Sequence, residues 1–302
     1  MKSHRFSSQG LAILALFALV LIWGYNWVVM KIAVRYAAPF DYAALRVLLG
    51  GLTLLLVLVW RRQSPRPKRV AGTAAVGLLQ MAGYYGLSTW ALVSGGAGKT
   101  AVLNYAMPFW VFVLAWLLLH ERPSRLQWIG VFVALTGLLC ILMPFSLEGG
   151  VLSKGLALLS SMSWAGGIII AKKIQQREPL DLLSFTAWQM LFGGLPLLAA
   201  ALLIPSPPID WSGPFIAALI YSVIPGNAIA WLLWSYALSR LPAGVAGLGT
   251  LGAPVIGVLS ARLQLGEEPT LVEAVGMLLL LGALVLNSAH ALSGYPKKSE
   301  TS

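Results

Sequence analysis

Charge is scarce in this chain of 302 residues. Asp, Glu, Lys and Arg together make up 10% of it, whereas hydrophobic residues make up 58%. Soluble domains carry about 25% charged residues. A fold of this length cannot hide so much apolar surface from water, so much of that surface must face lipid. The scarcity of charge therefore excludes a soluble globular protein and indicates an integral membrane protein.

Cysteine is almost absent, since Cys140 is the one cysteine of the sequence. A single cysteine excludes an internal disulfide and a cysteine-based metal cluster. Acidic residues are absent from the middle of the apolar runs, and the three histidines also lie at the ends of such runs. A membrane enzyme would need His, Asp or Glu gathered at one depth. We therefore expect no enzyme, no catalytic residue, no metal and no cofactor.

The missing carboxylates also limit what a binding site inside the membrane could hold. A proton-coupled pump usually carries a carboxylate or histidine inside the membrane, and a site for a bare cation needs a buried negative charge. Neither is visible here, which favours a neutral or zwitterionic substrate. Its carboxylate could rest on a helix N-terminus or a lysine, and its ammonium group on aromatic faces.

The apolar residues form long runs. Ten runs reach the length of about 20 residues that a helix needs to cross a bilayer: 10–30, 42–60, 70–92, 98–119, 126–145, 154–172, 182–204, 212–238, 243–263 and 270–290. With the N-terminus placed inside, 15 Lys and Arg residues fall in inside segments and 5 in outside segments. Basic residues accumulate in cytoplasmic loops. We therefore expect both termini in the cytoplasm.

The two halves of the chain repeat each other. Four residues of the first half recur 146 positions later: Pro108 as Pro254, Glu121 as Glu267, Pro123 as Pro269 and Gly130 as Gly276. Trp23 and Lys31 recur as Trp164 and Lys172, 141 positions later. Five spans per half is an odd number, so the second half must be upside down in the membrane, as in many secondary transporters. The sequence thus predicts an all-α membrane protein of ten helices, arranged as two inverted five-helix repeats.

This organisation sets the boundaries that we expect. They are a cytoplasmic tail at 1–9, a first repeat at 10–145, a periplasmic connector at 146–153, a second repeat at 154–290 and a cytoplasmic tail at 291–302. The net charge of +11 falls between apolar runs, which fits membrane orientation and not nucleic acid. Residues 95–100 resemble a phosphate-binding loop, but they join two apolar helices and lack the preceding strand. We expect neither nucleic acid nor nucleotide as a partner.

Polar and aromatic residues inside spans are the candidates for a substrate cavity, because an amide in hydrocarbon must face the bundle or a wet cavity. The alternative is that such amides only join helices together. The candidate cavity residues are Trp23, Asn26, Tyr84, Tyr85, Asn104, Tyr105, Trp164, Gln189, Asn227 and Trp231. Asn227 follows Pro225 and Gly226, a sequence that is typical of a broken helix.

Two pairs of repeat mates are candidates for gating or for anchoring a carboxylate. Lys31 and Lys172 lie at helix ends, where the alternative is a side chain that merely reaches the membrane interface. Pro108 and Pro254 lie inside spans, where each removes a backbone hydrogen bond and predicts a kink.

The chain resembles the EamA-type members of the drug/metabolite transporter superfamily. The resemblance rests on the ten spans, the repeat, Trp23-Gly24-Tyr25-Asn26 followed by Lys31, Arg46 in the second span, and the marks Glu121-Arg122-Pro123 and Glu267-Glu268-Pro269. It implies a multi-pass protein of a bacterial inner membrane, with a central cavity lined by spans 1, 3, 4, 6, 8 and 9. Small four-helix relatives use a Glu in the first span for proton exchange, and this chain has none there.

The sequence and the resemblance together predict an exporter of small neutral or zwitterionic metabolites, working by alternating access around a central cavity. Amino acids, including aromatic and other uncharged ones, are the favoured substrates, since bacterial members include exporters of amino acids. The alternative is a proton-coupled multidrug or cation efflux transporter of the same fold. The expected partners are a small-molecule substrate and the lipid bilayer, and we expect a monomer or a weak homodimer.

Overall fold

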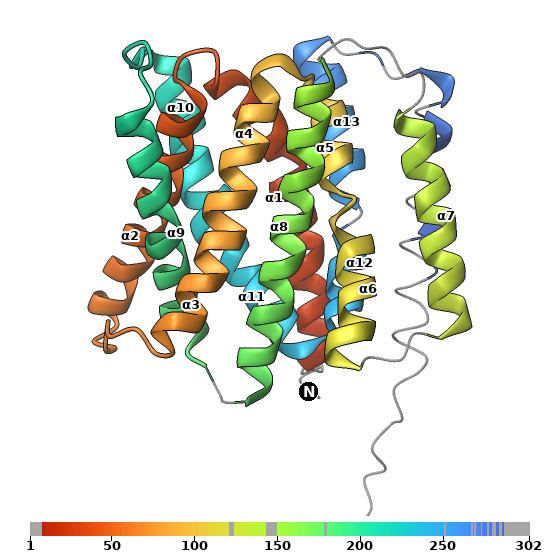
Figure 1. Ribbon diagram of the computed structural model, residues 1–302, viewed down its shortest axis with the longest axis horizontal. Helices are drawn as coiled ribbons and strands as arrows, with labels where there is room; N and C mark the ends of the chain where they lie inside the picture. The colour runs from red at the N-terminus through yellow and green to blue at the C-terminus, as the bar shows by residue number, and fades with distance from the viewer. Residues whose placement is uncertain are drawn as a thin grey trace, which may run out of the picture.

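The computed structural model describes residues 8–120, 124–142, 150–177, 180–250 and 252–266, and isolated positions between 268 and 286. Every regular element in these residues is a helix, and the long helices stand side by side along one direction (Figure 1). Within the first half the elements are α1 (Ser8–Ala33), α2 (Pro39–Trp60), α3 (Val70–Gly77), the π-helical turn η1 (Leu78–Gly83), α4 (Tyr84–Ser94), α5 (Ala97–Asn104), α6 (Met107–Leu119) and α7 (Arg125–Leu142).

The second half repeats this order. Its described elements are α8 (Gly150–Arg177), α9 (Leu182–Leu203), α10 (Gly213–Val223), the π-helical turn η2 (Ile224–Ile229), α11 (Ala230–Arg240), α12 (Ala243–Gly249) and α13 (Gly252–Leu265). Some boundaries follow from local chemistry. Asp181 caps α9, because its carboxylate accepts hydrogen bonds from the backbone N–H groups of Leu183 and Ser184.

Six described helical segments are long and apolar enough to cross a membrane: Gly10–Ala33, Pro39–Trp60, Val151–Arg177, Leu182–Leu203, Gly213–Arg240 and Ala243–Leu265. The expected spans 70–92, 98–119 and 126–145 are helical over most of their length, but two of them contain only shorter apolar helices, Phe109–Leu119 and Trp128–Cys140. The expected span 270–290 lies largely outside the described residues. The count of ten spans thus stays a prediction, whereas the multi-pass character is plain.

The breaks within helices occur at equivalent positions of the two halves. η1 begins at Leu78 and η2 at Ile224, which is 146 residues later. The interruption between α5 and α6 has its counterpart 145 residues later, between α12 and α13. Pro108 and Pro254 do not kink the middle of a helix, because each lies in the first turn of the helix after the interruption. The first turn has no intrahelical acceptor for its N–H groups, so proline is tolerated there.

The helices pack in two groups, and each group contains helices from both halves of the chain. α1 of the first half packs against α10, α11 and α13 of the second half. In the equivalent arrangement, α8 of the second half packs against α3, α4 and α6 of the first half. α2 and α9 pack against each other between these groups. We call α1, α10–α11 and α12–α13 the first group, and α8, α3–α4 and α5–α6 the second group.

Large apolar side chains cover the outside of the molecule. Exposed examples come from different helices and include Phe17, Leu56, Trp60, Leu202 and Leu263. In water such a surface would drive association, whereas in a bilayer it faces lipid chains. The interior, by contrast, holds five of the twelve tryptophans, Trp23, Trp27, Trp164, Trp231 and Trp234, together with the buried polar side chains.

Candidate functional site

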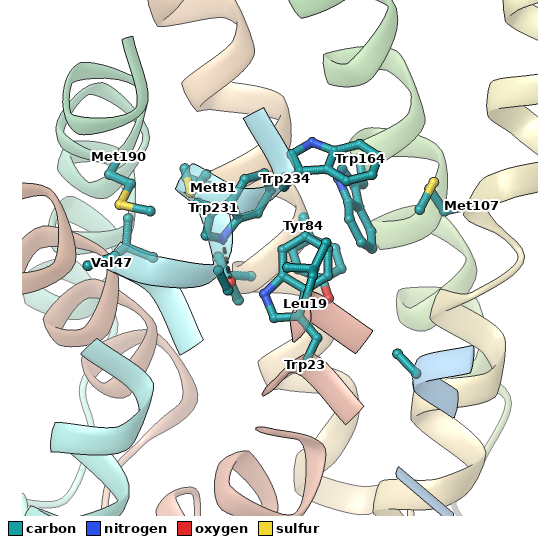
Figure 2. Close-up of a cluster of buried hydrophobic side chains, with 14 of the residues drawn as sticks. Leu19, Trp23, Val47, Met81, Tyr84, Met107, Trp164, Met190, Trp231 and Trp234 are labelled. Atoms are coloured by element: carbon teal, nitrogen blue, oxygen red, sulfur yellow. Dashed lines mark hydrogen bonds between the residues drawn. The ribbon is translucent and has the colours of Figure 1, made fainter. Parts of the chain in front are cut away.

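Aromatic side chains from both halves meet at the centre of the molecule. Trp23, Tyr84, Trp164, Trp231 and Trp234 gather there and come from α1, α4, α8 and α11 (Figure 2). The ring of Trp23 lies 5.1 Å from that of Trp164 and 5.3 Å from that of Trp231. These contacts are mostly edge-to-face, the arrangement that aromatic quadrupoles favour. The cluster joins the first group of helices to the second.

Two further tyrosines extend this cluster. The ring of Tyr84 lies 4.7 Å from that of Trp164 and 4.8 Å from that of Tyr85. Tyr105, at the interruption between α5 and α6, lies 6.4 Å from Trp164. We call the seven residues the aromatic cluster: Trp23, Tyr84, Tyr85, Tyr105, Trp164, Trp231 and Trp234. All of them are buried.

A polar network adjoins the aromatic cluster. The indole N–H of Trp231 donates to the Tyr85 hydroxyl over 2.8 Å, and that hydroxyl donates to Oδ1 of Asn227 over 2.8 Å. Asn227 lies in η2, and its amide nitrogen donates to the backbone oxygen of Arg46 over 2.7 Å. The indole N–H of Trp23 donates to the Gly226 carbonyl over 3.1 Å. The π-helical turn η2 therefore places a side-chain amide and a backbone carbonyl at the centre of the molecule. Such turns are frequent at functional sites.

Arg46 of α2 is the charged member of this network. Its Nη2 donates to Oδ1 of Asn26 over 3.4 Å and to Oδ1 of Asn227 over 3.3 Å. Its guanidinium carbon lies 4.4 Å from the ring centre of Tyr85 and 5.4 Å from that of Tyr42. The side chain is fully buried, and its Nε and Nη1 have no hydrogen-bond acceptor among the residues that the structure describes. Arg46 and Lys172 are the charged side chains among the buried residues that the structure describes.

Eight of the ten candidate cavity residues therefore belong to one region: Trp23, Asn26, Tyr84, Tyr85, Tyr105, Trp164, Asn227 and Trp231. Asn104 instead joins helices, because it accepts a hydrogen bond from Ser160 of α8 and donates to the carbonyl of Thr100. Gln189 lies on α9 where α3 crosses it, and both polar atoms of its buried side chain lack a partner within the described part of the chain.

The two candidate lysines make equivalent contacts. Nζ of Lys31 donates to the carbonyls of Leu92 and Gly95, each over 2.9 Å. Nζ of Lys172 donates to the carbonyls of Leu238 and Leu241 over 2.7 and 2.5 Å. Leu238 and Leu241 are 146 residues after Leu92 and Gly95. Each lysine caps the C-terminal end of the third span of its own half, where a cation is favoured. We call these contacts the two lysine clamps.

Arg46 and Trp234 are absent from the residues that the sequence singles out for the cavity. Arg46 could have been found from its position, because a single arginine eight residues into an apolar span is itself a signal of function. Trp234 follows Trp231 by three residues, so the two share a helix face. That spacing could have found it.

The comparisons with known proteins agree with this architecture. The model of the EamA-like transporter family matches the chain twice, at residues 10–143 and 153–289. The transporter YvbV of Bacillus subtilis is 30% identical over 89% of this chain and 88% of its own length. The transporter YoaV of the same organism is 26% identical over 91% of this chain and 96% of its own length.

A third relative carries a substrate in its name. A Salmonella typhimurium protein named "Probable amino-acid metabolite efflux pump" is 28% identical over 89% of this chain and 91% of its own length. A crystal structure with 19% sequence identity has the same fold, with a TM-score of 0.76 over 93% of this chain and 98% of that one. The two family matches cover most of the sequence and confirm the resemblance seen in its motifs: the chain belongs to the EamA-like transporter family, as a multi-pass membrane transporter with two family repeats.

Proposed function

We propose that this protein exports small neutral or zwitterionic metabolites, and amino acids foremost, by alternating access between two inverted five-helix repeats. The observation that carries the proposal is the pair of lysine clamps. They are related by the repeat spacing, and each joins the two groups of helices: Lys31 links α1 to the end of α4, and Lys172 links α8 to the end of α11.

The direction of the helices supports the inversion. In Figure 1 the third span of the first half runs upward from α3 to α4, whereas that of the second half runs downward from α10 to α11. The fourth spans are reversed in the same way, from α5 down to α6 and from α12 up to α13. The two clamps therefore lie at opposite ends of the bundle. Opening one while the other stays closed would expose the centre to one side of the membrane at a time.

The substrate class follows from the central residues. The aromatic cluster offers apolar and π surfaces, and the polar network offers amide, hydroxyl and guanidinium groups beside them. The relative named "Probable amino-acid metabolite efflux pump" supports this substrate class. The alternative of a cation or multidrug transporter is disfavoured, because the buried charges in the described residues are positive and would repel a cation.

Orientation follows from the basic residues. The excess of Lys and Arg in the segments assigned to the inside supports a bacterial inner-membrane protein with both termini in the cytoplasm. In that orientation the Lys31 clamp closes the periplasmic end and the Lys172 clamp closes the cytoplasmic end.

Efflux from proteoliposomes tests the proposal. Vesicles loaded with radiolabelled neutral amino acids should release them faster with the protein than without it. Trp164→Ala should lower that rate by at least about tenfold, because it removes a ring that contacts five others of the aromatic cluster. Trp60→Ala is the matched control, since Trp60 is 82% exposed at the end of α2.

The same experiment addresses energy coupling and the alternative. Release that ignores an imposed pH gradient is expected for a facilitator without a membrane-buried carboxylate. Release that requires the gradient, or transport of cationic dyes in place of amino acids, would contradict the proposal and favour the proton-coupled drug exporter.

A further inference from the structure

We propose that Arg46 is the substrate's carboxylate anchor, and that this transporter accepts only solutes that carry a carboxylate. The inference rests on the transport function proposed above and narrows its substrate class. The site consists of Arg46 with Asn26, Asn227 and Tyr85, and through Tyr85 it adjoins the aromatic cluster, where the apolar part of the substrate would lie.

The first step of the argument is charge. A guanidinium buried in a membrane protein is costly unless an anion or several good acceptors compensate it. In the part of the chain that the structure describes, Arg46 contacts two amide oxygens and two tyrosine rings, and none of these is an anion. The carboxylates of Asp41 and Asp181 lie elsewhere, accepting hydrogen bonds from Ser206 and from the start of α9. The described residues therefore provide no anion that balances the charge of Arg46.

The second step is hydrogen-bonding capacity. A guanidinium has five N–H donors in a planar fork. The two on Nη2 face Asn26 and Asn227 over 3.4 and 3.3 Å, which is long for a charged donor. The three on Nε and Nη1 have no acceptor among the described residues. A carboxylate accepts two parallel hydrogen bonds from neighbouring nitrogens of the fork, Nη2 together with Nε or Nη1, and would replace one of the long contacts to the asparagines. A hydroxyl or a single carbonyl cannot accept such a pair.

The third step is position. The guanidinium of Arg46 is held over the rings of Tyr85 and Tyr42. The backbone carbonyl of Arg46 accepts a hydrogen bond from the side-chain amide of Asn227 in η2. Contacts to α1, α4 and η2 thus fix the fork before any substrate arrives, which favours binding. Tyr85 is shared with the aromatic cluster through the indole of Trp231. A carboxylate on Arg46 would therefore place the rest of an amino acid beside tryptophan rings from both halves.

A purely structural Arg46 is the competing explanation. In that case the side chain only ties α2 to α1 and η2, and changing it would alter folding without altering which solutes bind. The two explanations differ in one measurable quantity, the ratio of affinities for an amino acid and for its amide, in which an uncharged carboxamide replaces the carboxylate.

The first experiment measures this ratio in the wild-type protein. Quenching of tryptophan fluorescence in purified full-length protein reports binding of leucine, valine and methionine, of their amides, and of 4-methylpentanoate, which has the carboxylate of leucine without its ammonium group. We expect each amide to bind at least about tenfold more weakly than its acid, and 4-methylpentanoate to bind within about tenfold of leucine. Equal affinity for acid and amide, or no binding of any carboxylate, would overturn the inference.

Variants then assign the ratio to Arg46. Arg46→Gln should bring the affinity for the acid down to that for the amide, whereas Arg46→Lys should keep part of the preference because it keeps the charge. Arg61→Gln is the matched control, since Arg61 is an exposed arginine just beyond the end of the same helix. Preference for the acid that survives unchanged in Arg46→Gln would overturn the proposal.

Asn26→Asp provides a second test that keeps Arg46, in case the protein does not fold without the arginine. The new carboxylate would pair with Nη2 of Arg46, so we expect a higher melting temperature together with at least about tenfold weaker binding of leucine. A structural Arg46 predicts the higher melting temperature with unchanged binding. The experiments distinguish failure of the proposed transport function from failure of the proposed anchor. If carboxylates bind to the protein but are not released from vesicles, only the transport function is contradicted. If acids and amides are released equally, only the role of Arg46 as anchor is contradicted.

Discussion

Tyr85 is the residue that connects the two parts of the site. Its hydroxyl lies between the indole of Trp231 and the amide of Asn227, and its ring lies under the guanidinium of Arg46. Each of these neighbours is buried, so none can turn to water if the tyrosine hydroxyl is removed. A buried donor or acceptor without a partner costs about 1–3 kcal/mol.

Tyr85→Phe should therefore lower the free energy of unfolding by about 1–3 kcal/mol, measured by denaturant unfolding in detergent micelles. Tyr84→Phe is the matched control, because Tyr84 is the adjacent ring of the same cluster and no hydrogen bond from its hydroxyl joins the network. Equal losses for the two variants would show that the network between Trp231 and Asn227 adds no stability.

At the scale of elements, close approach of α3 and α9 supports the π-helical turn η1. A Cβ atom added to Gly193 would lie 2.1 Å from the carbonyl oxygen of Gly77, and one added to Gly77 would lie 2.3 Å from that of Gln189. Backbones in membrane proteins approach this closely where small residues face each other. The glycines thus hold α9 against the third span next to the turn that precedes Tyr84 and Tyr85.

Gly193→Ala should force α3 and α9 apart and lower the melting temperature, by an amount that corresponds to about 1–3 kcal/mol of overpacking. Gly155→Ala in α8 is the matched control, because a Cβ there would meet nothing within 4 Å. The control should be neutral or stabilising by up to about 1 kcal/mol, since alanine favours a helix more than glycine does. Thermal unfolding of both variants checks this, and an unaffected Gly193→Ala protein would contradict the packing argument.

At the scale of the whole molecule, the two groups of helices meet at the centre through the aromatic cluster and at the ends through the lysine clamps. Both clamps are formed in this structure, so each end of the bundle has a contact that joins the two groups. If the halves are inverted, the clamps are not redundant, because each one controls access from a different side of the membrane.

Lys31→Met and Lys172→Met should consequently have opposite effects on access. A cysteine placed at Ala228, buried in η2, reports access to the centre in a Cys140→Ser background. In oriented vesicles a membrane-impermeant maleimide should label it several-fold faster from one side in Lys31→Met and from the other side in Lys172→Met. Lys173→Met is the control, because Lys173 is exposed beside Lys172. Faster labelling from the same side in both variants would contradict the inverted arrangement.

Particular residues show how far sequence reasoning extends to the site. Trp23, Trp164, Asn227 and Trp231 could be found because bulky aromatics and an amide inside apolar runs are unusual at any position. The grouping of these residues could not be derived, since it depends on how α1 and α11 cross. Asn104 shows the converse, because its partner Ser160 lies on a helix 56 residues away and only packing revealed it as a residue that joins helices.

The sequence by itself determined the membrane environment, the helical spans and the twofold repeat, because these follow from hydrophobicity, length and residue spacing along the chain. Only the tertiary structure decided that Arg46 lies against Asn26, Asn227 and Tyr85 without an anionic partner, and that Lys31 and Lys172 cap equivalent helix ends. The physical reason is that hydrophobicity acts on each segment separately, whereas the partner of a buried charge is set by contacts between segments distant in sequence.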